Sequence, residues 1–393
     1  MTVTATSAGP GVQARRARVA VAAVFLTNGA LFANVVPRYP ELKESLDLSN
    51  ALLGTALAAG PLGALTGGLF ASAAIRLFRS SRTGAFGISV VALGFLLVAV
   101  APTWWALAAA LFLAGAADAI VDVAQNAHGL RVQRLYERSI VNSFHGVWSI
   151  GAVLGGLMGA AAAGLGLPLG VHLAVSGALF SGTALVAYRF MLPGPDHADR
   201  PTTPGGRRAV PGAAVWMLAA LGLLAVFGSL VEDAGASWGA LFLTEDVGAA
   251  AATAGLAFVA LQVAMTAGRL LGDRAVDRFG QRTVTRFGGA LAAAGMGYAL
   301  AFPSVGSALA GFALAGLGTA TLVPAAMHTA DELPGLPPGV GLAAVSWVLR
   351  VGFLASPPLV GLVADHSSLR VGLLSVVIAG AGTVLFGRVL LNR

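Results

Sequence analysis

Cysteine is absent from the 393-residue sequence, which excludes a disulfide framework, a thiolate metal site and a cysteine nucleophile. Lysine is nearly absent as well, since Lys43 is the single lysine among 24 basic residues. The zinc-protease motif H-E-x-x-H and the nucleotide-binding P-loop G-x-x-x-x-G-K-[ST] do not occur. We therefore expect a chain that is not an enzyme, has no cofactor, binds no metal and makes no direct use of ATP.

Charge is scarce throughout the sequence. Charged residues make up 10% of the chain and hydrophobic residues 57%, and the mean hydropathy is +0.82. A soluble domain carries about 25% charged residues, so this chain could not cover its surface in water, and a lipid bilayer is its expected environment. The net charge of +7 does not indicate a nucleic-acid partner, because the arginines recur in short loops and form no single basic patch.

Twelve apolar stretches are long enough to cross a membrane as helices of about 20 residues. They cover residues 17–36, 51–75, 84–101, 104–130, 139–164, 168–190, 213–234, 250–272, 284–302, 304–329, 338–363 and 370–390. The first stretch is too long for a signal peptide and has no clear cleavage site. The predicted fold class is an all-α membrane protein whose twelve transmembrane helices form two pseudo-symmetric six-helix bundles.

A polar stretch rich in proline, glycine and charge divides the chain in the middle. The predicted division is a cytoplasmic tail over 1–16, a six-helix bundle over 17–191, a linker over 192–211 and a second bundle over 212–393. The two halves echo each other in their arginine-rich loops and in the small residues of their fifth helices. Two parallel repeats with a substrate site between them are a known plan of transporters.

Basic residues are distributed unevenly over the loops. With the N-terminus inside, 19 of the 24 basic residues lie on the cytoplasmic side, and the outer loops hold only Arg38, Lys43 and Arg370. This asymmetry predicts that both termini are cytoplasmic. Arg269 and Arg350 remain within helices.

Polar residues form stripes on two consecutive helices. Asp118, Asp122 and Asn126 are spaced i, i+4, i+8, so they share one helix face. Asn142, His145 and Trp148 share a face of the next helix. Asp122 and His145 lie at similar depths, about 10–12 Å from the cytoplasmic surface, so adjacent helices can bring them together. Intramembrane acids mark substrate or proton pathways, although each of these groups also has an alternative role in holding helices together.

Further candidates lie on other helices. They are Asn28 in the first helix, Glu232 at the outer end of the seventh, Gln262 in the eighth, and Trp347 and Arg350 in the eleventh. Arg350 lies near the predicted bilayer midplane, where it either docks an anionic or hydroxylated substrate, counters the charge of Asp118, or forms a structural ion pair. Trp148 and Trp347 either stack on a substrate ring or pack against neighbouring helices. Three tryptophans, Trp104, Trp105 and Trp238, are predicted to lie in the interfacial belt. Two histidines, His128 and His172, are weak candidates for a functional site because they lie near helix ends.

The loop after the eighth helix reads Gly272-Asp-Arg-Ala-Val-Asp277-Arg-Phe-Gly280-Gln-Arg282. It resembles the signature G-x-x-x-D-R-x-G-R-R of the major facilitator superfamily, and the resemblance covers essentially the whole chain. The corresponding loop of the first half, over 76–82, has neither the aspartate nor the glycine. The resemblance implies a cytoplasmic gate formed by Asp273, Arg274, Asp277, Arg278 and Arg282.

Several other stretches are similar to a bacterial inner-membrane branch of that superfamily, related to the fucose–proton symporter. They include Pro37–Ser49, Asp122–Asn126, Ser143–Gly151 and Gly268–Asp273. This resemblance implies a proton-driven carrier of a small solute. Proton coupling is then expected at Asp122, His145, Asp118 and Glu232. Substrate contacts are expected at Asn28, Asn126, Asn142, Trp148, Gln262, Trp347 and Arg350.

Three functions remain open at this point. Uptake of a sugar-like or other polar solute is favoured by the cluster of acids, Asn, His and Trp. Efflux of a drug-like compound is suggested by Gly151-x-x-x-Gly155, which matches part of the antiporter signature G-x-x-x-G-P-x-x-G-G. A non-transporting sensor built on the same fold would tolerate the altered first-half loop. The expected partners are the solute, protons and the bilayer, and the chain is expected to be a monomer in the bacterial inner membrane.

Overall fold

The computed structural model of the chain describes residues 11–136, 140–194, 196, 212–334, 336 and 340–391, and for 142, 212–214 and 273 the backbone alone. Helices dominate these residues, and none of them lies in a strand. The elements of the first half are α1 (Val12–Val35), η1 (Val36–Arg38), α2 (Tyr39–Ser45), α3 (Asn50–Phe78), α4 (Ser80–Ala99), α5 (Trp104–Arg134), α6 (Val141–Gly164) and α7 (Leu169–Tyr188). The all-α fold predicted from the sequence is confirmed.

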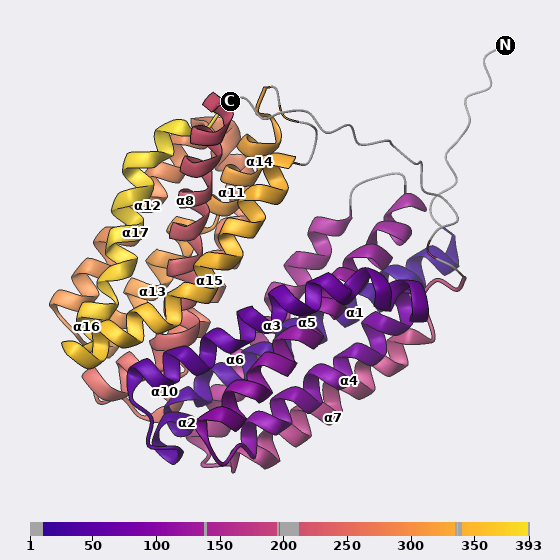
Figure 1. Cartoon of the computed structure of the whole chain (residues 1–393), viewed down its shortest axis with the longest axis horizontal. Coiled ribbons are helices and arrows are strands. Elements are labelled where there is room, and N and C mark those ends of the chain that lie inside the picture. The colour runs from indigo at the N-terminus through magenta and orange to yellow at the C-terminus, as the bar shows by residue number, and fades with distance from the viewer. Residues whose placement is uncertain are drawn as a thin grey trace.

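The second half consists of helices that are interrupted more often (Figure 1). Its elements are α8 (Gly212–Asp233), η2 (Ala234–Trp238), α9 (Gly239–Leu241), η3 (Phe242–Asp246), α10 (Ala251–Ala254), α11 (Leu256–Phe279), α12 (Gln281–Ala301), α13 (Val305–Thr319), α14 (Leu322–Asp331), α15 (Val340–His366), α16 (Leu369–Gly372), α17 (Leu374–Phe386) and η4 (Gly387–Val389). Pro324 explains the break between α13 and α14, because a proline ring clashes with the carbonyl four residues earlier in a continuous helix. The stretch predicted over 304–329 is still one apolar span, Val305–Asp331, with this break inside it.

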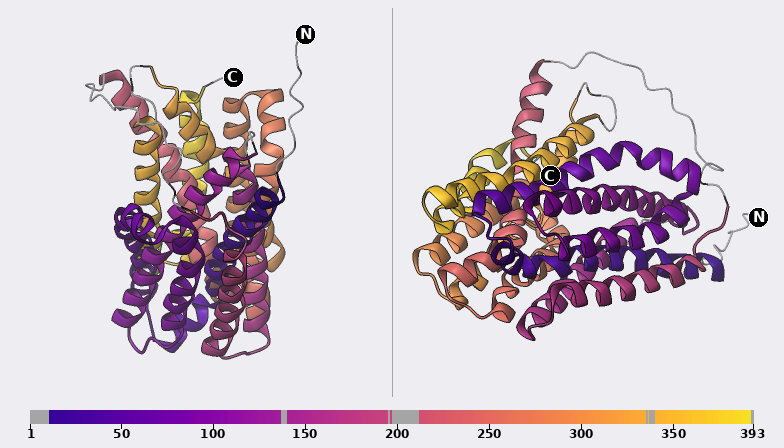
Figure 2. Two further views of the ribbon diagram at one scale, coloured as in Figure 1. Left: turned by 90° about the vertical axis from the view of Figure 1, so that its right-hand side faces the viewer. Right: turned by 60° about the horizontal axis from the view of Figure 1, so that its bottom comes forward.

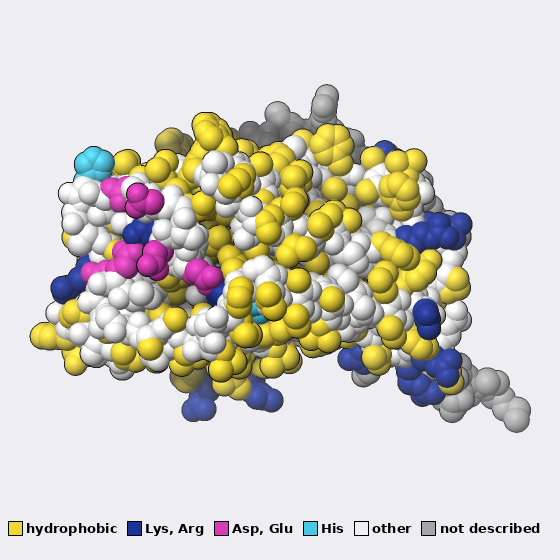
Figure 3. Space-filling view, turned by 90° about the horizontal axis from the view of Figure 1, so that it is seen from below, with side chains coloured by type: hydrophobic (Ala, Val, Ile, Leu, Met, Phe, Trp, Pro, Cys, Tyr) yellow, Lys and Arg dark blue, Asp and Glu magenta, His cyan; other side chains and the backbone are white. Residues whose placement is uncertain are grey.

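Eleven helical stretches within the described ranges are long and apolar enough to cross a membrane. The helix α12 is a twelfth long helix, with 21 residues; it is not one of these eleven stretches, and its sequence contains Arg282 and Arg286. Large hydrophobic side chains such as Leu69, Leu77 and Phe287 point outward and are 69–75% exposed. Figure 3 shows many yellow hydrophobic side chains on one face, with Asp and Glu gathered near one end and Lys and Arg at both ends. Such a surface suits lipid and not water.

The segment after α1, predicted to be an outer loop, is helical and continues as η1 and α2 to Ser45. Arg38, predicted to lie in this loop, is only 2% exposed. It donates hydrogen bonds to Glu41 (2.7 Å) and to the carbonyl of Leu167 (2.6 Å), so it ties this segment to the turn before α7.

The two halves, coloured indigo to magenta and pink to yellow in Figure 2, are built from the same set of helix pairs. In the first half α3 packs on α5, α1 on α6 and α7, and α4 on α5 and α7. In the second half α11 packs on α13, α8 on α15 and α17, and α12 on α13 and α17. The six membrane-crossing helices of the first half can be matched in chain order with α8, α11, α12, α13, α15 and α17 of the second. Each packed pair of the first half then corresponds to a packed pair of the second half. The contacts between halves, α3 with α15 and α6 with α11, coincide in the same way.

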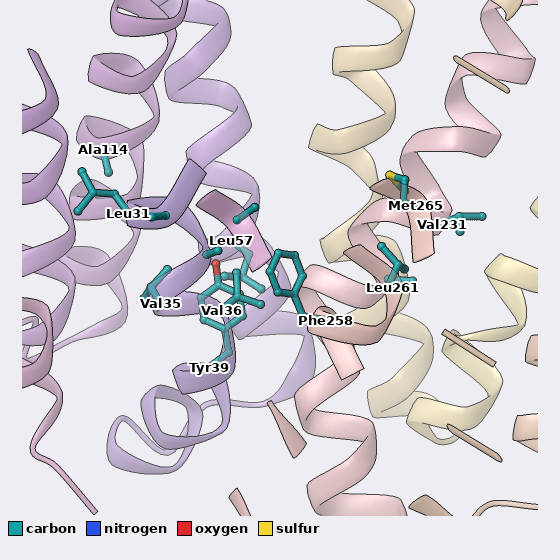
Figure 4. Close-up of a cluster of buried hydrophobic side chains, with 14 of the residues drawn as sticks. Leu31, Val35, Val36, Tyr39, Leu57, Ala114, Val231, Phe258, Leu261 and Met265 are labelled. Atoms are coloured by element: carbon teal, nitrogen blue, oxygen red, sulfur yellow. The ribbon is translucent and has the colours of Figure 1, made fainter. Parts of the chain in front are cut away.

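One end of the molecule joins the halves by polar contacts. Asp365, at the end of α15, accepts from the backbone nitrogens of Asn50 and Ala51 at 2.8 Å each, at the beginning of α3. A carboxylate at a helix N-terminus is favoured by the helix dipole. Lys43 also pairs with Glu245 at 2.6 Å. Just inside this end, Phe258 of α11 points toward Tyr39 and Val36 of the first half (Figure 4).

Candidate functional site

Asn28, Asp118 and Trp148 meet from three different helices, α1, α5 and α6. The indole nitrogen of Trp148 donates to Asn28 Oδ1 at 2.7 Å, and Asn28 Nδ2 donates to Asp118 Oδ1 at 2.6 Å. Because an indole N–H can only donate, it fixes the orientation of the Asn28 amide. The contact with Asn28 therefore uses Asp118 Oδ1 as an acceptor.

Asp122, Asn126 and His145 form a second chain of hydrogen bonds. Asn126 Nδ2 donates to Asp122 Oδ1 at 3.0 Å, and Gln125 Nε2 donates to the same oxygen at 3.2 Å. The Asn126 oxygen then faces His145 Nε2 at 3.1 Å, so this nitrogen carries the proton. The structure thus brings Asp122 and His145 into one cluster, joined through Asn126 and not by a direct bond.

These residues surround a cavity of about 280 Å³ that we call the polar cavity. It is lined by Asn28, Asp118, Asp122, His145, Trp148, Ser149 and Arg269. Arg269 comes from α11 in the second half, where it also pairs with Glu232 at 3.7 Å. The polar cavity therefore combines two carboxylates of the first half with a guanidinium of the second.

A second cavity, of about 390 Å³, lies between the halves, and we call it the central cavity. Its polar lining consists of Asp118, Trp148, Glu232, Asp233, Ser237, Gln262 and Arg350. The rest of its wall is apolar and includes Phe32, Tyr39, Phe95, Phe258 and Phe353. Small-molecule sites are typically apolar cavities with a few polar groups in fixed positions. Asp118 and Trp148 belong to the walls of both cavities.

The predicted substrate residues are divided by the structure. Arg350 and Gln262 line the central cavity together with Asp118. Trp347 is 55% exposed on α15 and lines neither cavity. The side chain of Asn142 lies outside the described residues.

Two predictions about the seventh helix are corrected. Asp233 is 7% exposed and lines the central cavity, although the predicted end of the seventh helix at residue 234 would place it near the membrane interface. Trp238, predicted to lie in an interfacial belt, is fully buried. Both changes have one cause: the helix does not end near 234 but continues through η2, α9 and η3 to Asp246, so these side chains lie well inside the bundle.

The segment Gly235-Ala-Ser237-Trp-Gly239 matches the serine-hydrolase pattern G-x-S-x-G. In hydrolases this pattern forms a sharp turn between a strand and a helix. Here it forms the π-helical stretch η2 and the first residue of α9. The Ser237 hydroxyl donates to Asp233 Oδ1 at 2.6 Å within the same stretch. The pattern is therefore part of the helix and no nucleophile elbow.

The predicted gate loop is only partly described. Asp277 and Arg278 are exposed at the end of α11, and Arg282 donates to the carbonyl of Leu390 at 2.9 Å. The side chain of Asp273 lies outside the described residues. Gly280 links α11 to α12 with φ 79° and ψ 146°. This backbone conformation is accessible mainly to glycine.

The corresponding turn of the first half keeps this geometry without the glycine. Arg79 links α3 to α4 with φ 72° and ψ 152°. Such a conformation is strained for a residue with a side chain. The loop that appears altered in the sequence therefore forms the same turn as its counterpart in the second half.

The acid missing from this loop is supplied by Asp196, beyond α7. Asp196 accepts from the backbone nitrogen (2.7 Å) and the hydroxyl (2.5 Å) of Ser80 at the start of α4, and from Arg131 (3.0 Å). Burial raises the pKa of Asp196, but the Ser80 hydrogen bonds and the Arg131 charge outweigh it, so the pKa is held below its usual range. Ser80 also contacts His128 Nδ1 at 2.9 Å, and His128 Nε2 accepts from the backbone nitrogen of Leu192. We call these residues the Asp196 cluster.

One groove on the surface of the described residues is mainly apolar. A groove of about 630 Å³ beside α3, α4 and α5 is lined by exposed apolar side chains such as Phe78, Phe86 and Val90, as expected for a lipid-facing surface. Among the described side chains, no three His, Asp or Glu residues converge as metal ligands would.

Two six-helix repeats packed in the same pairs, with buried acids in cavities between them, define a membrane transporter. Residues 222–393 match the family described as Major Facilitator Superfamily. A transporter of Sinorhizobium fredii named y4wD is 32% identical over 333 residues, which cover 83% of this chain and 85% of that protein. Membrane protein MosC of Rhizobium meliloti is 31% identical over 92% of this chain and 87% of its own length. The chain belongs to the major facilitator superfamily.

Solved structures agree with this fold. A bacterial homologue of the human lysosomal transporter Spinster, in an inward-facing and unoccupied conformation, has a TM-score of 0.74 at 16% identity, covering 97% of this chain and 98% of its own. The nucleoside transporter NupG has a TM-score of 0.70 at 13% identity, covering 96% and 98%. A D-xylose–proton symporter has a TM-score of 0.67 at 15% identity, covering 95% and 96%. At these identities the likeness shows the fold alone.

Proposed function

We propose that this transporter accumulates a small polar solute by coupling its movement to protons. The observation that carries the proposal is the shared wall between the two cavities. Asp118 and Trp148 line both the central cavity, which has the size and character of a solute site, and the polar cavity, which holds the acids and His145. A solute in the central cavity would therefore change the surroundings of a group that can carry a proton.

The direction of the hydrogen bonds supports this role. Asn28 and Asn126 each donate to an aspartate, so both carboxylates have one oxygen held as an acceptor and another available to bind a proton. His145 lies at the other end of the second chain, and its imidazole can both accept and donate a proton. Arg269, 3.7 Å from Glu232, adds a guanidinium of the second half to the wall of the polar cavity beside these acids.

The arginine asymmetry supports an orientation for the transport cycle. If both termini are cytoplasmic, the end joined by Asp365 and Lys43 faces outward, and the structure represents an inward-facing form. Reporter tags at residues 1 and 393 should then report the cytoplasm, and one at Pro168 the exterior. A terminal tag found outside would contradict the orientation. We place the transporter in the bacterial inner membrane, as a monomer.

The solute class is supported by the mixed lining of the central cavity, which offers acids, an amide and a guanidinium beside aromatic rings. This combination suits a hydroxylated compound with an apolar ring face. Two of the similar structures are named for hydroxylated solutes, a nucleoside and D-xylose, and the second is named a proton symporter. Efflux has less support, because the glycines of its partial signature have a packing role. They bring α6 close to α1: a Cβ at Gly151 would strike the carbonyl of Leu26, and a Cβ at Gly155 would strike the carbonyl of Ala30.

Transport in proteoliposomes tests the proposal. A panel of labelled solutes is followed under an imposed pH gradient and, separately, in exchange at equal pH. We expect Asp122→Asn to abolish accumulation driven by the gradient while exchange remains, and His145→Ala to shift the pH optimum more than it weakens binding. Asp246→Asn, an acid outside both cavities, is the matched control.

The outcomes separate the possible functions. Accumulation by Asp122→Asn equal to that of the wild type would make Asp122 a structural residue and direct the test to Asp118 or Glu232. Export against the gradient would support efflux. A protein that binds solutes but never moves them would be a sensor.

A further inference from the structure

The apolar groove of about 630 Å³ lies on the first half of the molecule, and we call it the lateral groove. Its walls come from α3, α4 and α5, with Tyr188 of α7 among the lining residues. Three of its side chains, Phe78, Phe86 and Val90, are 49–57% exposed. The lateral groove therefore opens sideways on the hydrophobic surface, away from the two cavities that hold the acids.

The length of the lateral groove matches the depth of one lipid leaflet. Along α4 its lining runs from Arg82 to Val90, which is about 12 Å at 1.5 Å per residue. Because α4 is an apolar span of 20 residues, Val90 lies at its middle. The hydrocarbon core of a bilayer is about 30 Å thick, so one leaflet contributes about 15 Å. The groove thus follows the path of an acyl chain from the end of the span to the bilayer midplane.

The end of the groove beside the turn from α3 to α4 carries a positioned arginine. Arg82 Nε donates to the Tyr188 hydroxyl at 3.2 Å, and the Tyr188 ring packs edge-on against Phe86, with the ring centroids 5.2 Å apart. Within the described ranges the two terminal nitrogens of Arg82 have no hydrogen-bond partner. A guanidinium held at Nε presents these two nitrogens as a fork, which matches two oxygens of a phosphate. The Tyr188 hydroxyl accepts from Arg82 and keeps its own proton to donate.

The turn itself adds further positive charge. Arg76 and Arg79 are exposed beside Arg82, and none of the three forms an ion pair with another described residue. Asp196 lies at the same turn, but Arg131 pairs with it at 3.0 Å. A zwitterionic lipid brings an ammonium group that needs an acceptor, whereas an anionic lipid needs only donors and positive charge. Basic pockets at the ends of transmembrane helices bind anionic headgroups.

We propose that the lateral groove is a binding site for an anionic phospholipid, with one acyl chain along α4 and the phosphate on Arg82 and Tyr188. The site is independent of the transported solute. On α5 the groove is lined by Ala117 and Val121, which directly precede Asp118 and Asp122 in the sequence. A lipid in the groove would therefore pack against the helix that carries both acids of the polar cavity.

Native mass spectrometry of the full-length protein in detergent tests the site. The probes are dioleoylphosphatidylglycerol, dioleoylphosphatidylethanolamine with the same chains, and glycerol phosphate as a headgroup without chains. We expect one phosphatidylglycerol to bind at least about ten-fold more tightly than phosphatidylethanolamine, because three unpaired arginines face its charge. Glycerol phosphate should not displace it, because the headgroup alone makes no contact with the groove.

Two variants address the two parts of the site. Arg82→Gln should weaken the Kd for phosphatidylglycerol about ten-fold or more, the loss expected for hydrogen bonds to a charged group. Ala74→Phe places a ring in the groove and should weaken it about ten-fold, the loss expected when two methylene groups lose their contact. The matched controls are Arg388→Gln and Ala381→Phe, which change exposed residues outside the groove. Both should stay within about two-fold of the wild type.

Three results would overturn the inference. They are equal affinity for the two lipids, several lipids bound with one common affinity, and a wild-type Kd in both Arg82→Gln and Ala74→Phe. If Arg82→Gln does not elute as a folded protein from size-exclusion chromatography, Ala74→Phe alone decides the test. No solute or pH gradient enters this experiment, so its result does not depend on whether the proposed proton coupling is correct.

Discussion

Substitution of Asp196 by asparagine tests whether the Asp196 cluster holds the end of α7 to the start of α4. The change keeps the size of the side chain and removes its charge. It breaks the ion pair with Arg131 and turns an acceptor into a group that also donates, opposite the two donors of Ser80. The side chains of Asp196 and Arg131 are only 10% and 15% exposed, so water replaces the lost contacts poorly.

The expected loss is about 2 kcal/mol of stability. A hydrogen bond to a charged group contributes about 1.5–3 kcal/mol. Part of this is retained, because Arg131 still donates to the carbonyl of Pro193 at 2.9 Å and the asparagine oxygen can accept from one Ser80 donor. For a unit of about 200 residues, 2 kcal/mol lowers the Tm by about 4–8 °C.

The pH dependence gives a second, independent signature. The pKa of Asp196 in the folded protein is lowered, because the Ser80 hydrogen bonds and Arg131 outweigh the effect of burial. A carboxyl with a lowered folded pKa stabilises the protein above its unfolded pKa, and this contribution is lost as pH falls through the folded value. The difference between wild type and Asp196→Asn should therefore be constant from pH 7 to about pH 5, shrink as the pH falls below about 4, and disappear only below the lowered folded pKa of Asp196.

The assay is size-exclusion chromatography of the detergent-solubilised protein after heating, which needs no cysteine. Asp246→Asn serves as the control for loss of a carboxylate elsewhere. Equal melting of Asp196→Asn and wild type at pH 7 would refute the proposed role of the cluster. A deficit that persists unchanged at low pH would show that the charge of Asp196 is not its cause.

Three further predictions concern helix turns and packing. Arg79→Gly should raise stability by about 1 kcal/mol, since it relieves a strained turn, and Gly280→Ala should lower it by a similar amount; thermal melting that does not distinguish the two variants would contradict the strain. Gly151→Ala should destabilise because its Cβ would strike the carbonyl of Leu26, while Gly146→Ala on the same helix, with open space around it, should melt like the wild type. Asp277→Asn should shift the population toward the inward-facing form, read as faster labelling of an engineered cysteine in the central cavity from the cytoplasmic side; unchanged labelling would leave this loop with a topological role only.

The sequence predicted the fold because hydropathy and arginine distribution depend on local composition. Five of the candidate site residues are recognisable in the sequence because each is a polar or aromatic interruption of an apolar helix; they are Asp118, Asp122, Asn126, His145 and Trp148. The spacing of residues along a helix shows which of them share a face, and depth shows which are level with one another. Neither reveals which donor meets which acceptor across helices. The bond from Asn28 to Asp118 and the link of His145 to Asn126 depend on how α1, α5 and α6 pack.

Other features had no usable signal in the sequence. Asp233 appeared to lie at a helix end because hydropathy falls after it, whereas the helix continues through π-helical turns to Asp246. Asp196 lies in a polar stretch whose composition predicts a linker. Its hydrogen-bond partner Ser80 is 116 residues away in the sequence, so no local pattern connects the two. The position of His128 near a helix end makes it a weak site candidate in the sequence, yet its side chain is fully buried and contacts Ser80. Contacts between distant segments are set by tertiary packing and do not follow from local periodicity.

The shared wall of the two cavities has a thermodynamic consequence. If a solute in the central cavity alters the proton affinity of Asp118, protonation of Asp118 must alter the affinity for that solute by the same factor. Coupling would then be an equilibrium property of a single conformation, in addition to any property of the transport cycle. The number of protons released or taken up on binding could be counted in weakly buffered detergent solution, and it would set the limit on how steeply a pH gradient can concentrate the solute.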